Sequence, residues 1–312
     1  MTGPASSSGE ASAIDRRLMA AAIRYARRHV ALTGTNPSVA TLVVRDNGHG
    51  PVIVGRGVTA RGGRPHAETL ALAEAGSRAR GATAYVTLEP CAHHGRTPPC
   101  AEALVVAGIA RVVTAAADPD PRVCGRGHAI LRRAGIEVLE GLMSDLAFED
   151  LAGYLVRTIR KRPHVSLKLA VSADGMIGRR DGGQIAITGP VSRGQVHVMR
   201  SQSDAILIGI GTALEDDPTL TCRLPGLEDR SPIRIVLDRD LRLPADSKLA
   251  STAGKVPVWI AARPDADPER RAVLAAAGCR ILATEMHEGR IALPELLDDL
   301  AAEGLSRVMV EG

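Results

Sequence analysis

Aromatic side chains are nearly absent from this sequence, whose 312 residues include one Trp, one Phe and three Tyr. Proteins that bind single-stranded nucleic acid stack bases on aromatic side chains, so this scarcity argues against such a platform. The chain is nevertheless 45% hydrophobic, and its cores must be built from Ala, Val, Leu and Ile. The length allows two domains of ordinary size.

Long apolar runs, a strong charge and a signal sequence are also lacking. The formal net charge is +4 without a long basic run, which fits a protein that handles small anionic molecules. No stretch approaches the roughly 18 apolar residues of a membrane span. Residues 1–12 have neither the charged nor the apolar region of a signal peptide, and we expect a disordered tail. The sequence thus predicts no membrane partner and no nucleic-acid partner.

Cysteine is scarce, with five residues in the chain. Two of them, Cys91 and Cys100, belong to the motif described next. The other three, Cys124, Cys222 and Cys279, are expected to be free thiols. Free thiols indicate a reducing compartment, so we expect a cytoplasmic protein.

The most informative motif is His66-Ala67-Glu68, followed by Pro-Cys-Ala-His-His-Gly-Arg-Thr-Pro-Pro-Cys at 90–100. His66, Cys91 and Cys100 offer three zinc ligands, which leaves the fourth tetrahedral position open, as in catalytic sites. Zinc lowers the pKa of a water at that position toward neutrality. Glu68 can reach this water without ligating the metal, as the proton-shuttling Glu of zinc deaminases does.

The spacing of the two cysteines departs from the Pro-Cys-x-x-Cys of nucleobase-editing deaminases. Eight residues separate Cys91 from Cys100, and they include two His and one Arg. The alternative interpretation is a surface turn with an unrelated buried Cys at each end. Of His93 and His94, one is a candidate substrate contact, and the other is equally well explained as a solvated loop residue.

Alternating helix and strand patterns organise the first half of the chain. They predict helices at 13–30, 66–75, 98–107, 127–134 and 144–160, and strands at 42–45, 52–55, 84–88, 112–116 and 137–139. This alternation favours a sheet covered by helices. Both parts of the zinc motif then lie at helix N-termini near strand ends, where ligands bind and where the helix dipole favours thiolate.

A second unit is predicted from about residue 162. Strands are expected at 165–171, 205–208, 233–238, 256–261 and 308–310, and helices at 192–200, 267–277 and 293–302. A Gly-x-Gly-Thr run at 209–212 follows one strand. Such a run can approach a phosphate, but without a third Gly it is equally well explained as a tight turn.

Several charged residues are candidate ligands for an anionic substrate. Arg96, Arg200 and Arg223 suit a phosphate because the guanidinium forms bidentate hydrogen bonds, although solvated surface Arg is the alternative. Asp216, in an Asp pair before Pro, fits either a sugar hydroxyl or a turn. Lys168 in an apolar strand needs a partner or ligand, and we favour a substrate-facing role over an edge-strand position.

Both halves resemble the RibD family, in which a pyrimidine deaminase is fused to a reductase. The matching motifs include Thr-Asn-Pro-Ser-Val at 35–39, Thr-Leu-Glu-Pro-Cys at 87–91, Leu-Lys-Leu-Ala at 167–170 and Asp-Asp-Pro-Thr-Leu-Thr at 216–221. The resemblance covers nearly the whole chain after the tail. It implies an α/β fold, with a cytidine-deaminase-like three-layer domain at 13–160 and a dihydrofolate-reductase-like α/β domain at 161–312.

The resemblance also implies the activity, which is two steps of riboflavin biosynthesis. The first is zinc-dependent hydrolytic deamination of a diaminopyrimidinone that carries a ribosylamino 5′-phosphate. The second is NADPH-dependent reduction of its ribosyl group to ribityl. The cofactors are therefore Zn²⁺ and NADPH, the partner is a small phosphorylated pyrimidine, and we expect a homo-oligomer.

Residue roles follow from the same resemblance. His66, Cys91 and Cys100 would hold zinc, with Glu68 as the proton shuttle. Deaminase substrate contacts would be Asn36, His93, Arg96 and Asp118. Reductase substrate contacts, with Lys168 added from its place in the strand, would be Gln184, Arg200, Leu220, Arg223 and Glu311. NADPH contacts would be Ala170, Ala186, Thr212 and Asp216.

The sequence departs from the family pattern at several positions. Thr35, Ala40, Asp120 and Arg239 replace the usual Pro, Gly, Asn and Ser, and Gln184-Ile185-Ala186 replaces Ser-x-Trp. In the family, Val-Glu-Gly at 310–312 begins a further NADPH-binding loop, so we expect a truncated reductase domain with impaired reduction. The alternative functions are a nucleic-acid-editing deaminase, which shares the zinc motif, and a non-catalytic zinc protein, which would not need Glu68.

Overall fold

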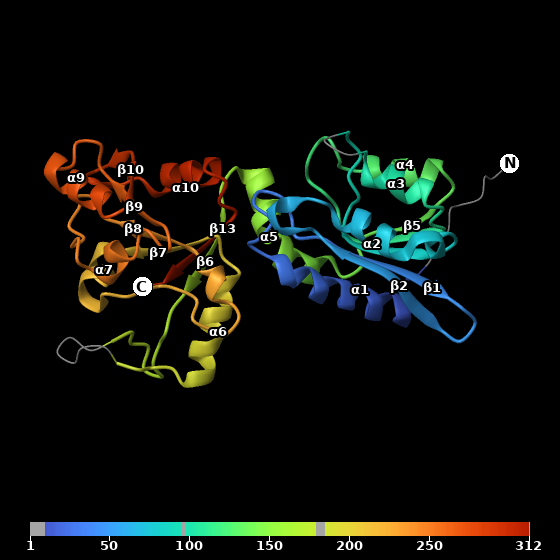
Figure 1. Ribbon diagram of the computed structural model, residues 1–312, viewed down its shortest axis with the longest axis horizontal. Helices are drawn as coiled ribbons and strands as arrows, with labels where there is room; N and C mark the ends of the chain where they lie inside the picture. The colour runs from blue at the N-terminus through green and yellow to red at the C-terminus, as the bar shows by residue number, and fades with distance from the viewer. Residues whose placement is uncertain (1–9, 95–97, 179–184, 312) are drawn as a thin grey trace. The chain divides into compact units, whose positions relative to one another are not determined.

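The computed structural model describes residues 10–94, 98–178 and 185–311 (Figure 1). The chain divides into two compact units, Met1–Arg160 and Lys161–Gly312. Each unit has its own sheet and its own buried apolar residues. Among the described residues, no helix combines the length and the hydropathy that crossing a membrane requires.

The first unit is a three-layer domain around a five-stranded sheet, in the order β2-β1-β3-β4-β5. Strands β3, β4 and β5 are parallel, whereas β1 runs antiparallel to β2 and β3. The helices are α1 (Ala13–Ala26), α2 (Ala67–Ala75), α3 (Cys100–Val106), α4 (Arg126–Arg133) and α5 (Ser144–Arg160). The strands are β1 (Ala40–Asp46), β2 (Pro51–Val58), β3 (Thr83–Leu88), β4 (Arg111–Ala116) and β5 (Glu137–Leu139).

Helices α1 and α5 pack against one face of this sheet, and α2, α3 and α4 lie on the other (Figure 1). Helix α1 begins with a complete capping box, in which Ser12 and Asp15 satisfy each other's backbone N–H groups. Asp15 is buried and also accepts hydrogen bonds from the Tyr85 hydroxyl at 2.7 Å and from Arg111 Nη1 at 2.7 Å. These contacts attach the start of α1 to strands β3 and β4.

Helix α2 lies unusually close to strand β2. A Cβ atom at Gly55 would come within 2.2 Å of the Ala71 carbonyl oxygen, and one at Gly57 within 2.0 Å of the Ala67 oxygen. On the helix side, the contact residues Ala67, Ala71 and Ala75 recur every four residues and form one face. Small residues on both sides therefore set the height of α2 above the sheet.

The second unit contains a six-stranded parallel sheet in the order β10-β9-β8-β7-β13-β6. Its strands are β6 (His164–Lys168), β7 (Ala205–Gly209), β8 (Ile233–Leu237), β9 (Val258–Ala262), β10 (Arg280–Ala283) and β13 (Arg307–Glu311). A separate hairpin is formed by β11 (Met286–His287) and β12 (Arg290–Ile291). The helices are α6 (Pro190–Ser201), α7 (Ile210–Asp216), α8 (Lys248–Ser251), α9 (Pro268–Ala276) and α10 (Leu293–Ala302).

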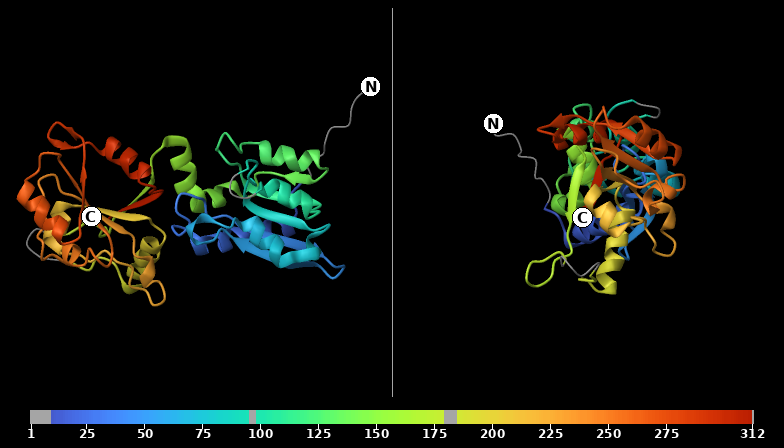
Figure 2. Two further views of the ribbon diagram at one scale, coloured as in Figure 1. Left: turned by 45° about the horizontal axis from the view of Figure 1, so that its top comes forward. Right: turned by 90° about the vertical axis from the view of Figure 1, so that its left-hand side faces the viewer.

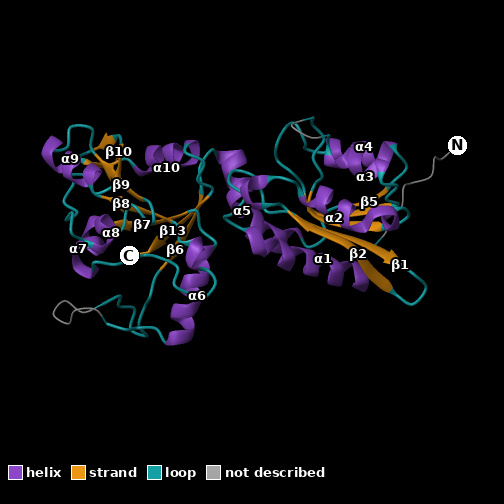
Figure 3. Ribbon diagram, in the orientation of Figure 1, coloured by secondary structure: helices purple, strands orange, loops and turns teal. Residues whose placement is uncertain are grey.

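Alternate residues of these strands face two separate apolar clusters. Ile206, Val236 and Ile260 pack with residues of α7, α8 and α9, whereas Leu207, Ile235 and Trp259 pack with α10. Helices therefore cover both faces of the sheet, as Figures 2 and 3 show. Near-continuous hydrophobic strands such as 258–262 are the expected consequence of burial on both faces.

The predicted elements mostly exist, with some corrections. The strand predicted at 165–171 ends at Lys168, because the last residue that pairs with β13 is Lys168, opposite Glu311. The alternative of a tight turn at 209–212 is wrong, since Gly209 is the N-cap of helix α7. The helix predicted at 13–30 ends at Ala26 and continues as a 3₁₀ turn. Strand β10 was not predicted.

Candidate active sites

Three metal-ligand atoms converge in the first unit. The Nδ1 atom of His66 lies 3.8 Å from Cys91 Sγ and 3.4 Å from Cys100 Sγ. All three ligand atoms lie within 4.8 Å of one another. The convergence of both sulfurs on His66 argues against the alternative of two unrelated buried cysteines.

Two helix starts and the end of one strand place these ligands. His66 is the N-cap of α2, Cys100 is the first residue of α3, and Cys91 follows strand β3. The backbone N–H of Cys100 donates to Cys91 Sγ at 3.2 Å, and that of Ala101 donates to the Cys91 carbonyl. Unpaired N–H groups at the start of α3 therefore stabilise negative charge on the Cys91 sulfur.

The electrostatics of this cluster call for a cation. Hydrogen bonding from the Cys100 thiol lowers the pKa of Cys91 to about 4. In turn, the hydrogen bond to Cys91 and burial raise the pKa of Cys100. Burial raises the pKa of Glu68 to about 7. Negative charges on the two sulfurs and on the buried carboxyl of Glu68 therefore repel one another. A divalent cation bound between them would offset this repulsion. One imidazole and two thiolates are a donor set that suits zinc.

Glu89 supports the turn that carries Cys91, a role that the sequence did not reveal. Its side chain has no exposed surface, and its carboxylate accepts the backbone N–H groups of Gly125 and Gly127 at 3.1 and 3.0 Å. A Cβ at Gly127 would lie 2.1 Å from the Pro90 carbonyl oxygen. The start of α4 is therefore fixed directly against the Pro90-Cys91 turn. The only signal in the sequence was the Leu-Glu-Pro-Cys motif itself.

Three other predicted deaminase residues are placed by the structure. The side chain of Asn36 packs directly against Gly63, where an added Cβ would come within 2.2 Å of Asn36 Nδ2. The Nδ1 atom of His93 is buried without a hydrogen-bond partner among the described residues. Asp118 is buried, which raises its pKa, and it accepts a hydrogen bond from the Tyr154 hydroxyl at 2.9 Å. Arg96 lies outside the described residues. His94 is exposed, as expected for a solvated loop residue.

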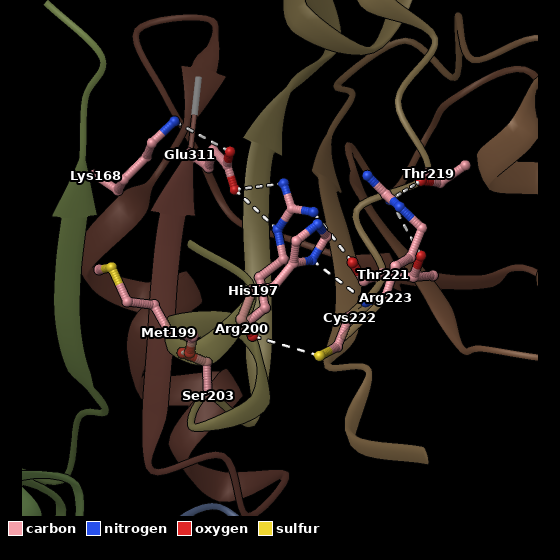
Figure 4. Close-up of polar contacts among 10 residues, drawn as sticks. All are labelled: Lys168, His197, Met199, Arg200, Ser203, Thr219, Thr221, Cys222, Arg223 and Glu311. Carbon is pink, nitrogen blue, oxygen red and sulfur yellow. Dashed lines mark hydrogen bonds and ion pairs between the residues drawn. The ribbon is translucent and has the colours of Figure 1, made fainter. Parts of the chain in front are cut away.

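A second polar cluster lies at the carboxyl ends of β6 and β13 in the second unit (Figure 4). Strand register places Lys168 opposite Glu311, and Lys168 Nζ lies 3.2 Å from Glu311 Oε1. Arg200, from α6, donates to Glu311 Oε2 from Nε and Nη2 at 3.2 and 3.0 Å. Lys168 is therefore on an edge strand, as the alternative held, and yet its ammonium group turns into this cluster.

The segment 219–223 forms the opposite wall of the cluster. Arg200 Nη1 donates to the Thr221 carbonyl at 3.1 Å, and Arg223 Nη1 donates to the Thr219 hydroxyl at 2.5 Å. Leu220 is buried in a left-handed backbone conformation, with φ of 53°. Such conformations in non-glycine residues persist where surrounding contacts hold them. Five of the six predicted reductase residues thus meet or border one cluster, while Gln184 lies outside the described residues.

The predicted NADPH residues are less closely grouped by direct contacts. Thr212 and Asp216 lie four residues apart on α7 and so share one face of that helix. Cβ atoms at Gly209 and Gly211 would meet no atom within 4 Å, so the backbone beside α7 is open to a ligand. Ala170 and Ala186 lie in irregular segments on either side of the undescribed residues 179–184.

Comparison with known proteins identifies both units. Residues 12–116 match the cytidine and deoxycytidylate deaminase zinc-binding region, and residues 163–312 match the RibD C-terminal domain. The chain is 40% identical to riboflavin biosynthesis protein RibD of Escherichia coli (strain K12) over 308 residues, which cover 95% of this chain and 81% of that protein. The chain belongs to the RibD family.

Solved structures of RibD proteins share the fold. Acinetobacter baumannii RibD, form 1, superposes with a TM-score of 0.81 at 38% identity, covering 95% of this chain and 80% of that one. A Thermotoga maritima protein, described as a diaminohydroxyphosphoribosylaminopyrimidine deaminase/5-amino-6-(5-phosphoribosylamino)uracil reductase, gives 0.82 at 33% identity with the same coverage. The predicted order, a cytidine-deaminase-like domain followed by a dihydrofolate-reductase-like domain, is confirmed. The family relation also confirms zinc and NADPH as the cofactors of this RibD chain.

Proposed function

We propose that this chain catalyses two successive steps on one phosphorylated pyrimidine of riboflavin biosynthesis. Its first unit replaces an amino group of a diaminopyrimidinone ribosylamino 5′-phosphate with oxygen and releases ammonia. Its second unit then reduces the ribosyl group to ribityl with NADPH. The observation that carries the proposal is the buried carboxyl of Glu68 beside three convergent zinc ligands, since a purely structural zinc site has no use for it.

In the deaminase unit, His66 Nδ1, Cys91 Sγ and Cys100 Sγ would hold zinc. Zinc supplies Lewis acidity, which makes water nucleophilic near neutral pH. Glu68 takes the proton from the attacking water and delivers it to the amine that leaves, so it ends the cycle in its starting state. Asn36, His93, Arg96 and Asp118 bind the substrate. The unpartnered Nδ1 of His93 is available for this contact.

In the reductase unit, NADPH supplies the two electrons and would lie against Ala170, Ala186, Thr212 and Asp216. The cations Lys168, Arg200 and Arg223 outnumber the acidic residue of the cluster in Figure 4, Glu311, which pairs with the first two. Such an excess of positive charge suits a phosphorylated sugar. Leu220 and Gln184 complete the substrate contacts.

The two steps can be tested separately. Purified chain is supplied with the diaminopyrimidinone substrate, and ammonia release and NADPH oxidation are followed in parallel. Ammonia release that requires zinc, followed by NADPH oxidation, is the expected result. Deamination of a single-stranded oligonucleotide, with no turnover of the pyrimidine, would contradict the proposal and support the editing alternative.

Zinc ligation by these residues has its own test. We expect one zinc per chain in the wild type, and Cys91→Ser should lower the zinc content. Cys124→Ser is the matched control, because Cys124 is exposed and lies outside the ligand cluster. Equal zinc contents in Cys91→Ser and wild type would show that the assignment is wrong.

The setting of the enzyme is part of the proposal. We infer a cytoplasmic homo-oligomer without a nucleic-acid partner. None of the five cysteines, all of which are described, forms a disulfide, which favours a reducing compartment. Apolar side chains on the edge strand β6, such as Leu167 with 66% of its surface exposed, favour association. Light scattering of the purified chain gives the oligomeric state, and a monomer at micromolar concentration would contradict this inference.

A further inference from the structure

His197 is a polar residue of the reductase cluster to which no role has been given so far. It lies on α6, three residues before Arg200, so both side chains leave the same face of the helix. Figure 4 shows its imidazole between the guanidinium of Arg200 and the segment that carries Arg223. The residue is half-buried.

The hydrogen bonding of His197 determines which ring nitrogen carries the proton. Its Nδ1 accepts the backbone N–H of Arg223 at 3.3 Å. A backbone N–H can only donate, so Nδ1 is the unprotonated nitrogen and Nε2 carries the proton. Burial, followed by the nearby Arg200 and Arg223, lowers the pKa of His197 and keeps the ring neutral. The imidazole thus presents an N–H donor from Nε2.

The same imidazole belongs to the wall made by residues 219–223. The backbone carbonyl of His197 accepts the Cys222 thiol at 3.4 Å, and the Thr221 carbonyl, which accepts Arg200 Nη1, is a neighbour of the ring. Lys168, Arg200 and Arg223 carry three positive charges here, and Glu311 is paired with two of them. A neutral donor among surplus cations adds a directed hydrogen bond without adding charge.

We propose that His197 is a substrate-binding residue of the reductase, donating from Nε2 to the substrate phosphate beside Arg200 and Arg223. The inference rests on the proposed function, because it takes the ligand to be a phosphate ester. Two cations fix the charge of the ligand, and the imidazole fixes the orientation of one phosphate oxygen. His197 touches the phosphate and not the carbon that is reduced, so it contributes to affinity and not to the chemical step.

Two substitutions separate ligand contact from support of Arg223. His197→Gln places an amide N–H near the position of Nε2 but loses the acceptor at Nδ1. His197→Asn keeps an acceptor near Nδ1 but loses the donor at Nε2. We expect His197→Asn to raise the KM of the reductase substrate about tenfold with kcat unchanged, which is the usual size of a lost hydrogen bond to a charged group. His197→Gln should raise KM about threefold at most.

The experiment measures NADPH oxidation by the full chain, with D-ribose 5-phosphate and D-ribose as competing inhibitors. His197→Asn should weaken inhibition by ribose 5-phosphate about tenfold and leave inhibition by ribose unchanged. Gln195→Asn, an exposed position on the same helix, is the control and should match wild type in all measurements. Equal KM values for wild type and His197→Asn, or a larger defect in His197→Gln than in His197→Asn, would overturn the inference. If wild type does not oxidise NADPH, the reduction step of the proposed function fails, and this inference fails with it, while the deamination step stands or falls on ammonia release.

Discussion

Glu68 shows how one buried side chain separates catalysis from metal binding. It follows His66, the proposed zinc ligand, by two residues, at the first turn of α2, and burial raises its pKa to about 7. A group with a pKa near neutrality is half protonated at the working pH, which favours proton transfer in both directions. A bound zinc ion would lower the pKa of Glu68, because a nearby positive charge favours the carboxylate. The position of the carboxyl beside the ligand cluster is therefore what fits it for proton transfer.

We therefore expect Glu68→Gln to keep zinc and fold while losing deamination by about a hundredfold or more, because the amide cannot accept the proton. Ammonia release and zinc content measure the two effects. Glu102→Gln is the matched control, since Glu102 lies in the first turn of α3 with a partly exposed side chain whose nearest charged partner is His94, at 3.6 Å. Near-normal deamination by Glu68→Gln would mean that another residue carries the proton.

At the scale of elements, the fit between α2 and β2 positions the two side chains proposed for zinc binding and proton transfer. Helix α2 carries Glu68 and begins at His66, and Gly57 lets its backbone approach the strand. Glycines in strand interiors often mark such a close approach of another backbone.

Gly57→Ala should therefore displace α2 and loosen the zinc site. The added Cβ would lie 2.0 Å from the Ala67 carbonyl oxygen, which is backbone and cannot turn aside. We expect at least a tenfold loss in zinc affinity, measured by competition with a chelator, together with a lower melting temperature. Gly194→Ala, where a Cβ meets no atom within 4 Å, should leave zinc affinity unchanged. Wild-type affinity in Gly57→Ala would show that α2 can shift without cost.

The attachment of α1 to the sheet makes a prediction with a pH dependence. Burial opposes ionisation of Asp15, yet hydrogen bonds from Arg111, Tyr85 and Ser12 hold its pKa well below the usual range. Since the pKa is lower in the folded state, the stabilisation is complete above the unfolded pKa of about 4. It is lost as the pH falls toward the folded value.

Asp15→Asn should cost about 2 kcal/mol of unfolding free energy at pH 7, less than the 3–5 kcal/mol of a fully buried pair because Arg111 is partly exposed. The difference from wild type should shrink below pH 4. Urea unfolding at several pH values measures it, with Asp145→Asn, an exposed residue in the first turn of α5, as control. A pH-independent difference would mean that Asp15 acts through packing alone.

At the scale of the whole molecule, two apolar cores predict two unfolding transitions. The buried cluster around Leu104 and Val113 belongs to the first unit, and those around Ile206 and Leu207 belong to the second. The zinc ligands belong to the first unit alone. A bound metal stabilises only the unit that holds it.

Removing zinc with a chelator should therefore lower one transition and leave the other in place. Scanning calorimetry measures both, and Asp15→Asn identifies the transition of the first unit. We expect a shift of about 5 °C or more in that transition, since binding at 100 times Kd contributes about 2.7 kcal/mol. A single transition that shifts as a whole would contradict the independence of the two units.

The sequence by itself determined the chemistry of the first unit and most of the element spans. Ligand types and spacing in His66-Ala67-Glu68 and 90–100 are local signals, and apolar periodicity marks helices and strands locally. The order of the two domains followed from the resemblance of both halves to the RibD family. The roles of the predicted substrate and cofactor residues stay predictions. Two of these residues, Arg96 and Gln184, lie outside the described part of the chain.

Only the tertiary structure decided what long-range pairing brings together. Strand β13 enters the sheet between β6 and β7, which places Glu311 opposite Lys168 across 143 positions of sequence. No periodicity reports which strands will neighbour each other, because the pairing energy depends on burial in the assembled sheet. For the same reason the roles of Glu89 and His197 emerged only in space, where a helix start and a loop meet these side chains.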